Sequence, residues 1–489
     1  MEKIGRYILR EKLFESRNST VYRGHKENET ESFIVRLLKT SYATPSEMAQ
    51  FRLEYDLIKN LDLKTVVQTI EMIDQKDGFA LILEDFKGVP VKDYLRGGEK
   101  FDIQSFLIIA ANIAETLGAL HARSIIHRNI KPKSILIHPD TKELKITDFG
   151  IAAILTHEND EVYNPGFVSD TLTYMSPEQT GRMNRSVDYR TDLYSLGITL
   201  YEMLTGLLPF KSQDPMELIH AHIAMMPKAP VKLDSRIPVI VSDILMRLLA
   251  KNPEARYQNG FGLEADFREC LKQLKEKNRI DSFELGKNDI SIRFIIPQKL
   301  FGREKEINTL ISRFEEAAER GKGISVMIVS GAPGIGKSAM IHEIHKPIVA
   351  RHGYFISGKY EQFRRDKPYS AIIQAFQLLV KQILSESAAR INLWKENLSK
   401  ALGDNGKVIT DVIPEVELII GQQPELPLLG PEESRNRFNF VFEKFMGVFP
   451  QKEHPVTLFL DDLQWADRAS LQLMKNIIFS DIHHLFIIF

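Results

Sequence analysis

The sequence predicts a multidomain chain, with a two-lobed α+β domain followed by an α/β domain built on a parallel sheet. Strand-like runs and one helix precede a mainly helical stretch, which is the layout of a small β-rich lobe joined to a larger helical lobe. A polar segment without apolar periodicity follows at 271–298. Apolar strands then alternate with helices around a glycine-rich turn, which indicates a parallel sheet. The predicted domains are therefore 1–270 and 299–489, with a linker at 271–298.

The small lobe is predicted from runs rich in Val, Ile, Leu and Phe that are separated by polar turns. These runs are residues 7–14, 20–26, 31–39 and 79–86. The stretch 47–61 between the last two predicts a helix. The larger lobe is predicted to be helical because apolar residues recur at spacings of three and four, which places them on one helix face. They are Phe106, Ile109, Ile113, Leu117 and Leu120.

Composition is that of an ordinary globular protein, with 43% hydrophobic and 26% charged residues in a chain of 489. Lys and Arg number 64 against 65 Asp and Glu, so no basic excess points to nucleic acid or an acidic membrane surface. The single cysteine, Cys270, excludes an internal disulfide and a cysteine-based zinc site. We recognise neither a leader nor an apolar run long enough to span a bilayer. We therefore expect a cytoplasmic protein that does not insert into membranes.

The most specific motif is "GAPGIGKS", which fits G-x-x-x-x-G-K-[ST] between an apolar strand and the helix-like "AMIHEIHK". Glycines let the main chain curl so that its N–H groups face phosphate oxygens. Lys337 can reach the β- and γ-phosphates, and the Ser338 hydroxyl can ligate Mg²⁺. The motif predicts an ATP site with Mg²⁺. Its glycines are Gly331, Gly334 and Gly336.

Two acidic residues follow a second apolar strand, Val456–Leu460, further along the chain. Asp461, at the end of this strand, can hold Mg²⁺ directly or through water. Asp462 can polarise an attacking water as a general base. A helix-capping role is the alternative for such acids, and the phosphate-binding loop upstream favours the catalytic interpretation.

Landmarks of a protein kinase occur in order in the first domain. Asp148 opens a D-F-G tripeptide, which binds magnesium in kinases, and the S-P-E ending at Glu178 stands in place of A-P-E. Glu54 lies where the helix of the small lobe carries its glutamate. Glu178 and Arg256 are expected to form a buried ion pair in the large lobe. The order of these landmarks predicts a protein-kinase-like fold.

Several catalytic positions of that motif set carry other residues. In "HRNIKPKS", Asn129 replaces the catalytic aspartate, and its neutral amide cannot take a proton. Ser134 replaces the asparagine that holds the second Mg²⁺. Arg36 replaces the lysine that contacts ATP, and its planar fork does not act as a point charge. Lys131, which can touch the γ-phosphate, and Asp148 remain.

The glycine-rich loop of kinases is also altered, because Phe14, Ser16 and Ser19 occupy its three glycine positions. Side chains there obstruct a close approach of the main chain to phosphate. Ile34 falls where a small alanine normally roofs the adenine, so it should crowd the base. Phosphoryl transfer depends on these parts acting together, so their combined loss favours a folded, non-catalytic module.

Longer stretches, among them "DTLTYMSPEQTGRMNRSVDYRTDLYSLGITLYEMLTGLLPF" and "GKYEQFRRDKPYSAIIQAFQ", resemble large bacterial signalling proteins. Those chains join a serine/threonine-kinase-like domain, an AAA/STAND-type ATPase, a GAF sensor and a histidine kinase. The resemblance implies a kinase fold at 1–270 and an ATPase after about 299, with Gly331–Ser338 as the phosphate loop and Asp461 and Asp462 as the Mg²⁺ and catalytic acids. Comparable members usually carry Asp at Asn129 and Lys at Arg36. The final "HHLFIIF" is interpreted as a buried strand, so the ATPase domain is expected to be incomplete at its C-terminus.

Three hypotheses for the function remain at this point. The first is an ATP-binding signal-transduction protein, in which the kinase-like domain binds protein partners and ATP is bound and slowly hydrolysed at Lys337. The second is an active serine/threonine kinase. The third is a truncated relic without activity.

Overall fold

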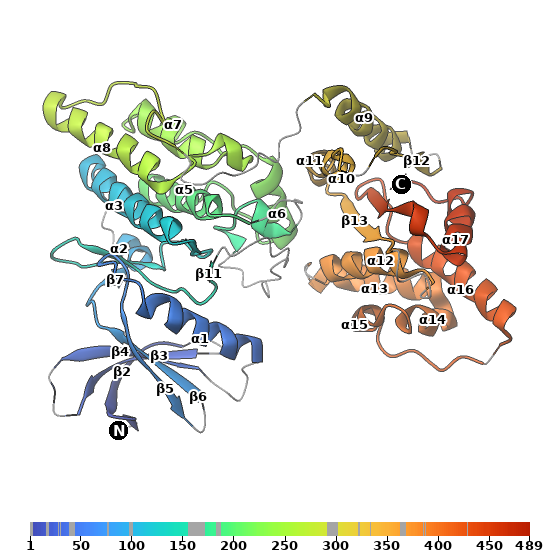
Figure 1. Cartoon of the computed structure of the whole chain (residues 1–489), viewed down its shortest axis with the longest axis horizontal. Coiled ribbons are helices and arrows are strands. Elements are labelled where there is room, and N and C mark those ends of the chain that lie inside the picture. The colour runs from blue at the N-terminus through green and yellow to red at the C-terminus, as the bar shows by residue number, and fades with distance from the viewer. Residues whose placement is uncertain are drawn as a thin grey trace.

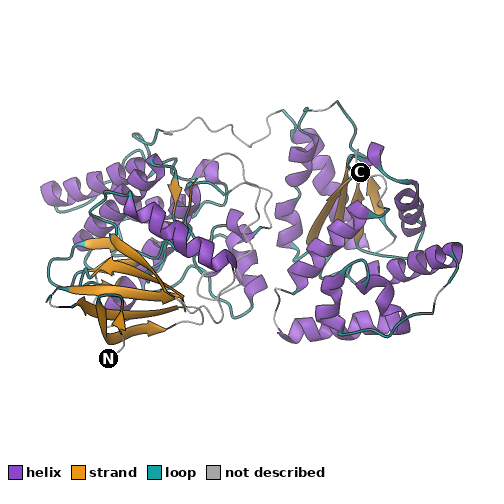
Figure 2. Ribbon diagram, turned by 60° about the horizontal axis from the view of Figure 1, so that its bottom comes forward, coloured by secondary structure: helices purple, strands orange, loops and turns teal. Residues whose placement is uncertain are grey.

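The computed structural model consists of two domains that lie side by side (Figure 1). Each domain has its own sheet, which lies at one end of the first domain and between helices in the second, and most strands belong to these two sheets (Figure 2). The structure describes residues 3–15, 19–27, 29, 31–38, 45–75, 78–96, 101–154, 172–181, 187–290, 302–320, 323–332, 334–361, 368–384, 386, 388–427 and 429–489.

The small lobe of the first domain is a six-stranded antiparallel sheet with the order β1-β2-β3-β4-β6-β5, and one helix packs against it. The four predicted strands and the helix are confirmed, and β1 and β5 are additional. Val35 on β4 and Leu81 on β6 are fully buried, because alternate side chains of the sheet face its core. The elements are β1 (Lys3–Ile4), β2 (Tyr7–Glu15), β3 (Ser19–Lys26), β4 (Ser32–Leu38), α1 (Pro45–Lys59), β5 (Thr69–Gln75) and β6 (Gly78–Glu84).

The large lobe is helical, as the sequence predicts, and its core surrounds helix α3. Short strands form two small sheets, in the orders β10-β9-β7 and β11-β8, that position the loops facing the small lobe. The elements are β7 (Val89–Pro90), α2 (Val91–Arg96), α3 (Ile103–Ala122), β8 (Ile125–Ile126), β9 (Ile135–Ile137), β10 (Leu144–Ile146), β11 (Ala153–Ile154), α5 (Arg190–Thr205), α6 (Pro215–Ala224), α7 (Val239–Leu248) and α8 (Gly260–Lys277).

Helix α3 corrects the expectation that the sequence holds no apolar run long enough to span a bilayer. Its 20 residues, with a mean hydropathy of 1.5, are long and apolar enough to cross a membrane. In the structure, however, 61% of this segment is buried, and it packs against α8 and α5 in the centre of the large lobe. The same apolar composition therefore serves a domain core here.

Residues 271–290, which the sequence places in the linker, lie along the large lobe. Residues 271–277 complete α8. Phe283 and Leu285 then pack against the core of this lobe. Asp289 accepts hydrogen bonds from the main-chain N–H of Gln258 at 2.9 Å. Residues 291–301 are outside the described part of the chain.

The second domain has a parallel sheet with the order β12-β15-β14-β13, as the alternating pattern predicts. Helices α9 to α11 cover one face of the sheet, and α12, α13, α16 and α17 cover the other. The elements are α9 (Glu304–Arg320), β12 (Ser325–Met327), α10 (Lys337–His342), α11 (His345–Ala350), β13 (Tyr354–Lys359), α12 (Ser370–Ile383), α13 (Ala388–Leu402), α14 (Gly406–Thr410), α15 (Glu417–Ile420), α16 (Pro431–Met446), β14 (Val456–Asp461), α17 (Arg468–Ile478) and β15 (Leu485–Ile488).

The helix expected after the phosphate loop is divided into α10 and α11. Pro347 explains the division, because a proline lacks the N–H that would bond to residue i−4 and its ring clashes with that carbonyl. The residue four positions earlier is Glu343, and the break between the helices falls at Glu343 and Ile344.

Candidate functional sites

The phosphate loop has the conformation that its glycines allow. Gly334 and Gly336 have φ angles of 80° and 87°, in the left-handed region that favours glycine. Gly336 caps α10, and Lys337 opens it. The Lys337 Nζ donates to the main-chain oxygens of Gly331 at 2.9 Å and Ala332 at 3.1 Å. The lysine ammonium thus lies over the loop that the motif assigns to phosphate.

The acids that end β14 meet the loop at the carboxyl edge of the sheet. The Ser338 Oγ donates to Asp461 Oδ2 at 3.1 Å, across 123 positions of sequence. This pair brings together the two oxygen ligands expected for Mg²⁺, one hydroxyl and one carboxylate. The donor set therefore fits the metal that the motif implies.

Two residues that the sequence analysis missed hold the second acid. The Gln464 Nε2 donates to Asp462 Oδ1 at 2.8 Å, and the Lys359 Nζ lies 3.4 Å from Asp462 Oδ2. Lys359 is the last residue of β13 and stands opposite Asp461 in the register. Because parallel strands end at a shared edge, the lysine at the end of "YFISGK" was the available signal.

In the kinase-like domain, Arg36 of β4 and Glu54 of α1 form an ion pair. The Arg36 Nη1 lies 2.9 Å from both carboxylate oxygens. Burial raises the pKa of Glu54 against the lowering effect of Arg36, and the charge of Asp148 raises it further. The charge of Glu54 in turn raises the pKa of Arg36. The arginine therefore keeps the helix of the small lobe connected to its sheet.

Asn129 contacts the D-F-G aspartate directly. Its Nδ2 donates to Asp148 Oδ2 at 2.7 Å. Asp148 has a φ of 70°, an uncommon backbone conformation for a non-glycine residue that recurs at functional sites. A kinase needs a carboxylate that accepts a proton at this position, and Asn129 supplies an amide donor instead. This donor is bonded to Asp148, the carboxylate that would bind magnesium.

Ser134 is fully buried, and its hydroxyl is engaged within the catalytic loop. The Oγ lies 2.9 Å from the main-chain oxygens of both Asn129 and Lys131, and it accepts from the Lys131 N–H at 3.0 Å. These contacts stabilise the loop. A metal-binding role for Ser134 and a phosphate contact by Lys131 stay predictions.

A buried network that the sequence did not reveal fixes the start of this loop. Asp192 at the beginning of α5 accepts from the main-chain N–H of His127 at 2.8 Å and of Arg128 at 2.7 Å. It also lies 2.9 Å from the His121 Nε2. Burial would raise the pKa of Asp192, but these partners hold it below its usual range. Asp192 thereby orients the segment that carries Asn129.

The predicted ion pair of Glu178 and Arg256 is confirmed. Two guanidinium nitrogens of Arg256 lie 2.7 and 2.9 Å from the two carboxylate oxygens of Glu178. Both side chains are almost completely buried. Arg256 also donates to main-chain oxygens of Ala250, Arg190 and Lys251, so every donor group of the fork contributes to the lobe.

Of the residues at the altered glycine-loop positions, Phe14 is 59% exposed on β2, Ser19 begins β3, and Ser16 lies outside the described residues. Ile34 packs against a hydrophobic cluster of the small lobe that Leu136 of β9 also contacts. Crowding of the adenine by Ile34 stays a prediction.

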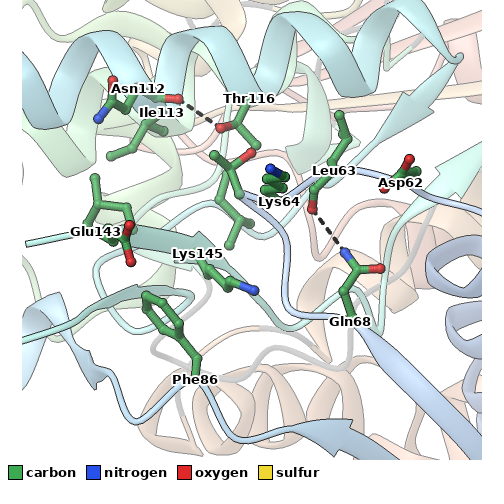
Figure 3. A pocket seen from close by; sticks show the side chains of 13 residues that line it. Asp62, Leu63, Lys64, Gln68, Phe86, Asn112, Ile113, Thr116, Glu143 and Lys145 are labelled. Atoms are coloured by element: carbon green, nitrogen blue, oxygen red, sulfur yellow. Dashed lines mark hydrogen bonds between the residues drawn. The ribbon is translucent and has the colours of Figure 1, made fainter. Parts of the chain in front are cut away.

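A separate cavity of about 470 Å³ lies between the lobes, and none of the predicted site residues lines it. Its walls come from the segment before β5, from α3, from β10 and from Phe86 (Figure 3). The Lys145 Nζ forms an ion pair with Glu84 beside it.

The predicted site residues thus form two clusters, one in each domain. The first joins Arg36, Glu54, Asn129 and Asp148, and a Cβ on Gly150 would lie within 4 Å of the Arg36, Glu54 and Asp148 side chains. The second joins the phosphate loop with Asp461 and Asp462. Fold and geometry together define a protein-kinase-like domain joined to a phosphate-loop ATPase.

Comparisons with known proteins agree with this assignment. The model of the protein kinase domain matches residues 7–272, more than half of the chain, and that of the AAA ATPase domain matches 299–488. The chain belongs to the protein kinase domain family and carries an AAA ATPase domain after it.

Curated relatives include both histidine kinases and serine/threonine kinases. A hybrid signal transduction histidine kinase G of Dictyostelium discoideum is 33% identical over 461 residues, covering 76% of this chain and 13% of that protein. Histidine protein kinase 1 of Candida albicans is 26% identical over 405 residues, covering 75% of this chain and 16% of its own. A probable serine/threonine-protein kinase of Clostridium perfringens is 32% identical over 270 residues, or 55% of this chain and 38% of that one. The chain therefore spans a minor part of each relative.

Proposed function

We propose that this chain is an ATP-binding signalling module, in which ATP and Mg²⁺ bind at the phosphate loop of the ATPase domain. The observation that supports this most directly is the 3.1 Å contact between Ser338 and Asp461. It brings a hydroxyl and a carboxylate, both oxygen groups of the kind that Mg²⁺ prefers, together from distant parts of the chain, in the segment that carries the lysine of the loop.

The residues of this site have separate roles in the proposal. Lys337 and the main-chain N–H groups of the loop bind the phosphates, with the three loop glycines allowing the close approach. Ser338 and Asp461 would hold Mg²⁺, which would neutralise phosphate charge. Asp462, held by Lys359 and Gln464, accepts the proton of the attacking water as its oxygen bonds to the γ-phosphorus and the bond to ADP breaks.

The kinase-like domain acts in this proposal as a binding module for protein partners rather than as an efficient transferase. Asn129 has no lone pair able to take a proton at neutral pH, and its amide donates to Asp148 instead. Loss of a general base costs about 10²–10⁴-fold in rate.

The proposal also includes a cytoplasmic location, a bacterial origin, the absence of nucleic-acid partners and the absence of membrane insertion.

ATP affinity of the full chain tests the phosphate-loop site. Lys337→Ala removes a charged hydrogen-bond donor to phosphate, worth about 1.5–3 kcal/mol, so Mg-ATP should bind about 10- to 100-fold more weakly. Lys395→Ala, a change of an exposed lysine in the same domain, is the matched control. Equal ATP affinity of wild type and Lys337→Ala would show that the loop is not the site.

An active serine/threonine kinase is the second candidate, and the Arg36–Glu54 ion pair favours it. This pair, together with Asp148 and Lys131, preserves part of the machinery that phosphoryl transfer requires. Transfer of radiolabelled phosphate to a generic protein substrate distinguishes the two. Asn129→Asp should raise transfer about 10²–10⁴-fold if the missing base limits the reaction. Transfer by wild type at the rate of Asn129→Asp would establish the second candidate.

A further inference from the structure

Among the described residues, one helix of each domain takes part in a contact between the two domains. Helix α6 of the kinase-like domain packs against α11 of the ATPase domain, and Figure 1 shows them facing each other. Val349 of α11 is 7% exposed and belongs to a hydrophobic cluster whose other buried members, including Leu218 and Ala221 of α6, are all from the kinase-like domain. The Val349 side chain is thus buried by the neighbouring domain.

A pair of histidines extends this contact beyond the apolar cluster. The rings of His220 on α6 and His352 after α11 lie 4.3 Å apart at an angle of 35°. Burial lowers the pKa of His352, as do His454 and Arg390 of its own domain, while the charges of Glu217 and Asp214 on the kinase-like domain raise it. Charged residues of both domains therefore influence the pKa of His352.

Helix α11 is also connected to the nucleotide site. It follows α10, whose first residue is Lys337, and only the break at Glu343 and Ile344 separates the two helices. Ile344 and Ile348 are fully buried against the sheet, in a cluster that includes Phe459 of β14. A displacement of the loop on binding phosphate would be transmitted through packed side chains to α11, because close-packed interiors transmit strain.

The C-terminal end of α11 also contacts other elements of the ATPase domain. Arg351 forms ion pairs with Glu315 and Glu319 of α9. The main-chain oxygen of His352 lies 2.9 Å from His454 Nδ1. These contacts connect the segment after α11 to α9 and to the loop before β14, within the ATPase domain.

We propose that the α6–α11 contact couples ATP binding at the phosphate loop to the kinase-like domain. The coupling rests on the proposed ATP site. It is reciprocal, because a contact that changes when ATP binds must itself change the affinity for ATP. Loss of the contact is thus expected to change ATP affinity at Lys337, which lies on α10 and not on either of the contacting helices.

Hydrogen exchange of the full chain, with and without Mg-ATP, tests the coupling. The peptide covering Pro215–Ala224 should change its exchange rate at least about twofold when ATP is added to wild type. The same peptide should not respond in Lys337→Ala, which separates this effect from ATP bound elsewhere. Val349→Asp should abolish the response and change ATP affinity about fivefold or more.

Two further variants serve as controls. Leu418→Asp places the same charge on a side chain of the ATPase domain that is 72% exposed, and it should behave as wild type. His352→Asn removes the ring that stacks on His220 and suits the φ of 53° at this position, since asparagine tolerates the left-handed region. It should weaken the response of α6 even if Val349→Asp fails to fold.

The outcomes separate this inference from the proposed function. If ATP binds at Lys337 and the exchange of α6 is the same with and without it, the coupling is wrong and the ATP site stands. The coupling is also wrong if His352→Asn and Val349→Asp, both folded, retain the wild-type response and ATP affinity. If Lys337→Ala binds ATP as wild type does, the proposed ATP site is wrong and the coupling falls with it.

Discussion

Asn129→Asp should make the kinase-like domain dependent on magnesium for its stability. In the wild type, an amide N–H donates to Asp148 at 2.7 Å. The substitution places a second carboxylate at this position and replaces a hydrogen bond by repulsion between like charges. Without a cation, the two groups must move apart or one must take a proton.

The loss of stability can be estimated for either way of relieving this repulsion. Two charges that relax to 4 Å repel by about 4 kcal/mol at an effective dielectric constant of 20. Protonating one aspartate at pH 7, about 3 units above its ordinary pKa, also costs about 4 kcal/mol. This value is an upper bound because Asp148 is only half-buried. It corresponds to a lower unfolding temperature by about 2–4 °C for each kcal/mol.

Thermal unfolding of the full chain in EDTA and in excess Mg²⁺ measures this effect. Asn129→Asp should melt several degrees below wild type in EDTA and recover with Mg²⁺, because the metal binds between the two carboxylates. Asn129→Ala loses only the hydrogen bond, worth about 1 kcal/mol, and should show no magnesium-dependent recovery. Equal melting of Asn129→Asp and wild type in EDTA would refute the contact between Asn129 and Asp148.

Two predictions concern buried ionisable side chains of the large lobe. Arg256→Met leaves Glu178 buried without its partner and should lower the free energy of unfolding by about 3–5 kcal/mol in urea, whereas Lys277→Ala, which loses an exposed ion pair, should cost less than about 1 kcal/mol. A similar loss in both would contradict the buried pair. Burial lowers the pKa of His222 to about 3, so the unfolded chain binds this proton first and stability falls as the pH decreases below about 6.5. His222→Gln should show a shallower decrease between pH 6 and 4 when unfolding is followed by circular dichroism, and an unchanged slope would be evidence against a buried neutral histidine.

The phosphate loop could be predicted because its residues are contiguous. Glycine freedom, the lysine and the serine act within eight positions, and flanking apolar patterns supply the strand and the helix. The approach of Asp461 to Ser338 also followed from a general property, since parallel strands end at one edge of the sheet. Lys359 obeys the same rule and was missed because a lysine ending a strand is common at solvent-exposed edges.

The landmarks of the kinase-like domain were equally readable, and so was the pairing of Glu178 with Arg256, but other contacts were not. Asp192 binds the loop of Asn129 from 63 positions downstream, and the contact depends on how α5 packs under the loop. No local pattern encodes this approach. The apolar helix α3 shows the same limit, because its composition suits a membrane or a core and only the surrounding helices decide between them.

Sequence alone determined the presence of two domains, the phosphate-binding loop, and the replacement of a proton-accepting group by an amide at Asn129, because each depends on residue type at short spacing. Tertiary structure decided which groups share a site. The Asn129 amide donates to Asp148, and the chain after the phosphate loop breaks at Glu343 and Ile344 into a second helix, whose Val349 is buried against the other domain. Such contacts arise from the packing of whole elements, whose relative positions minimise exposed apolar surface and are not written in any local segment.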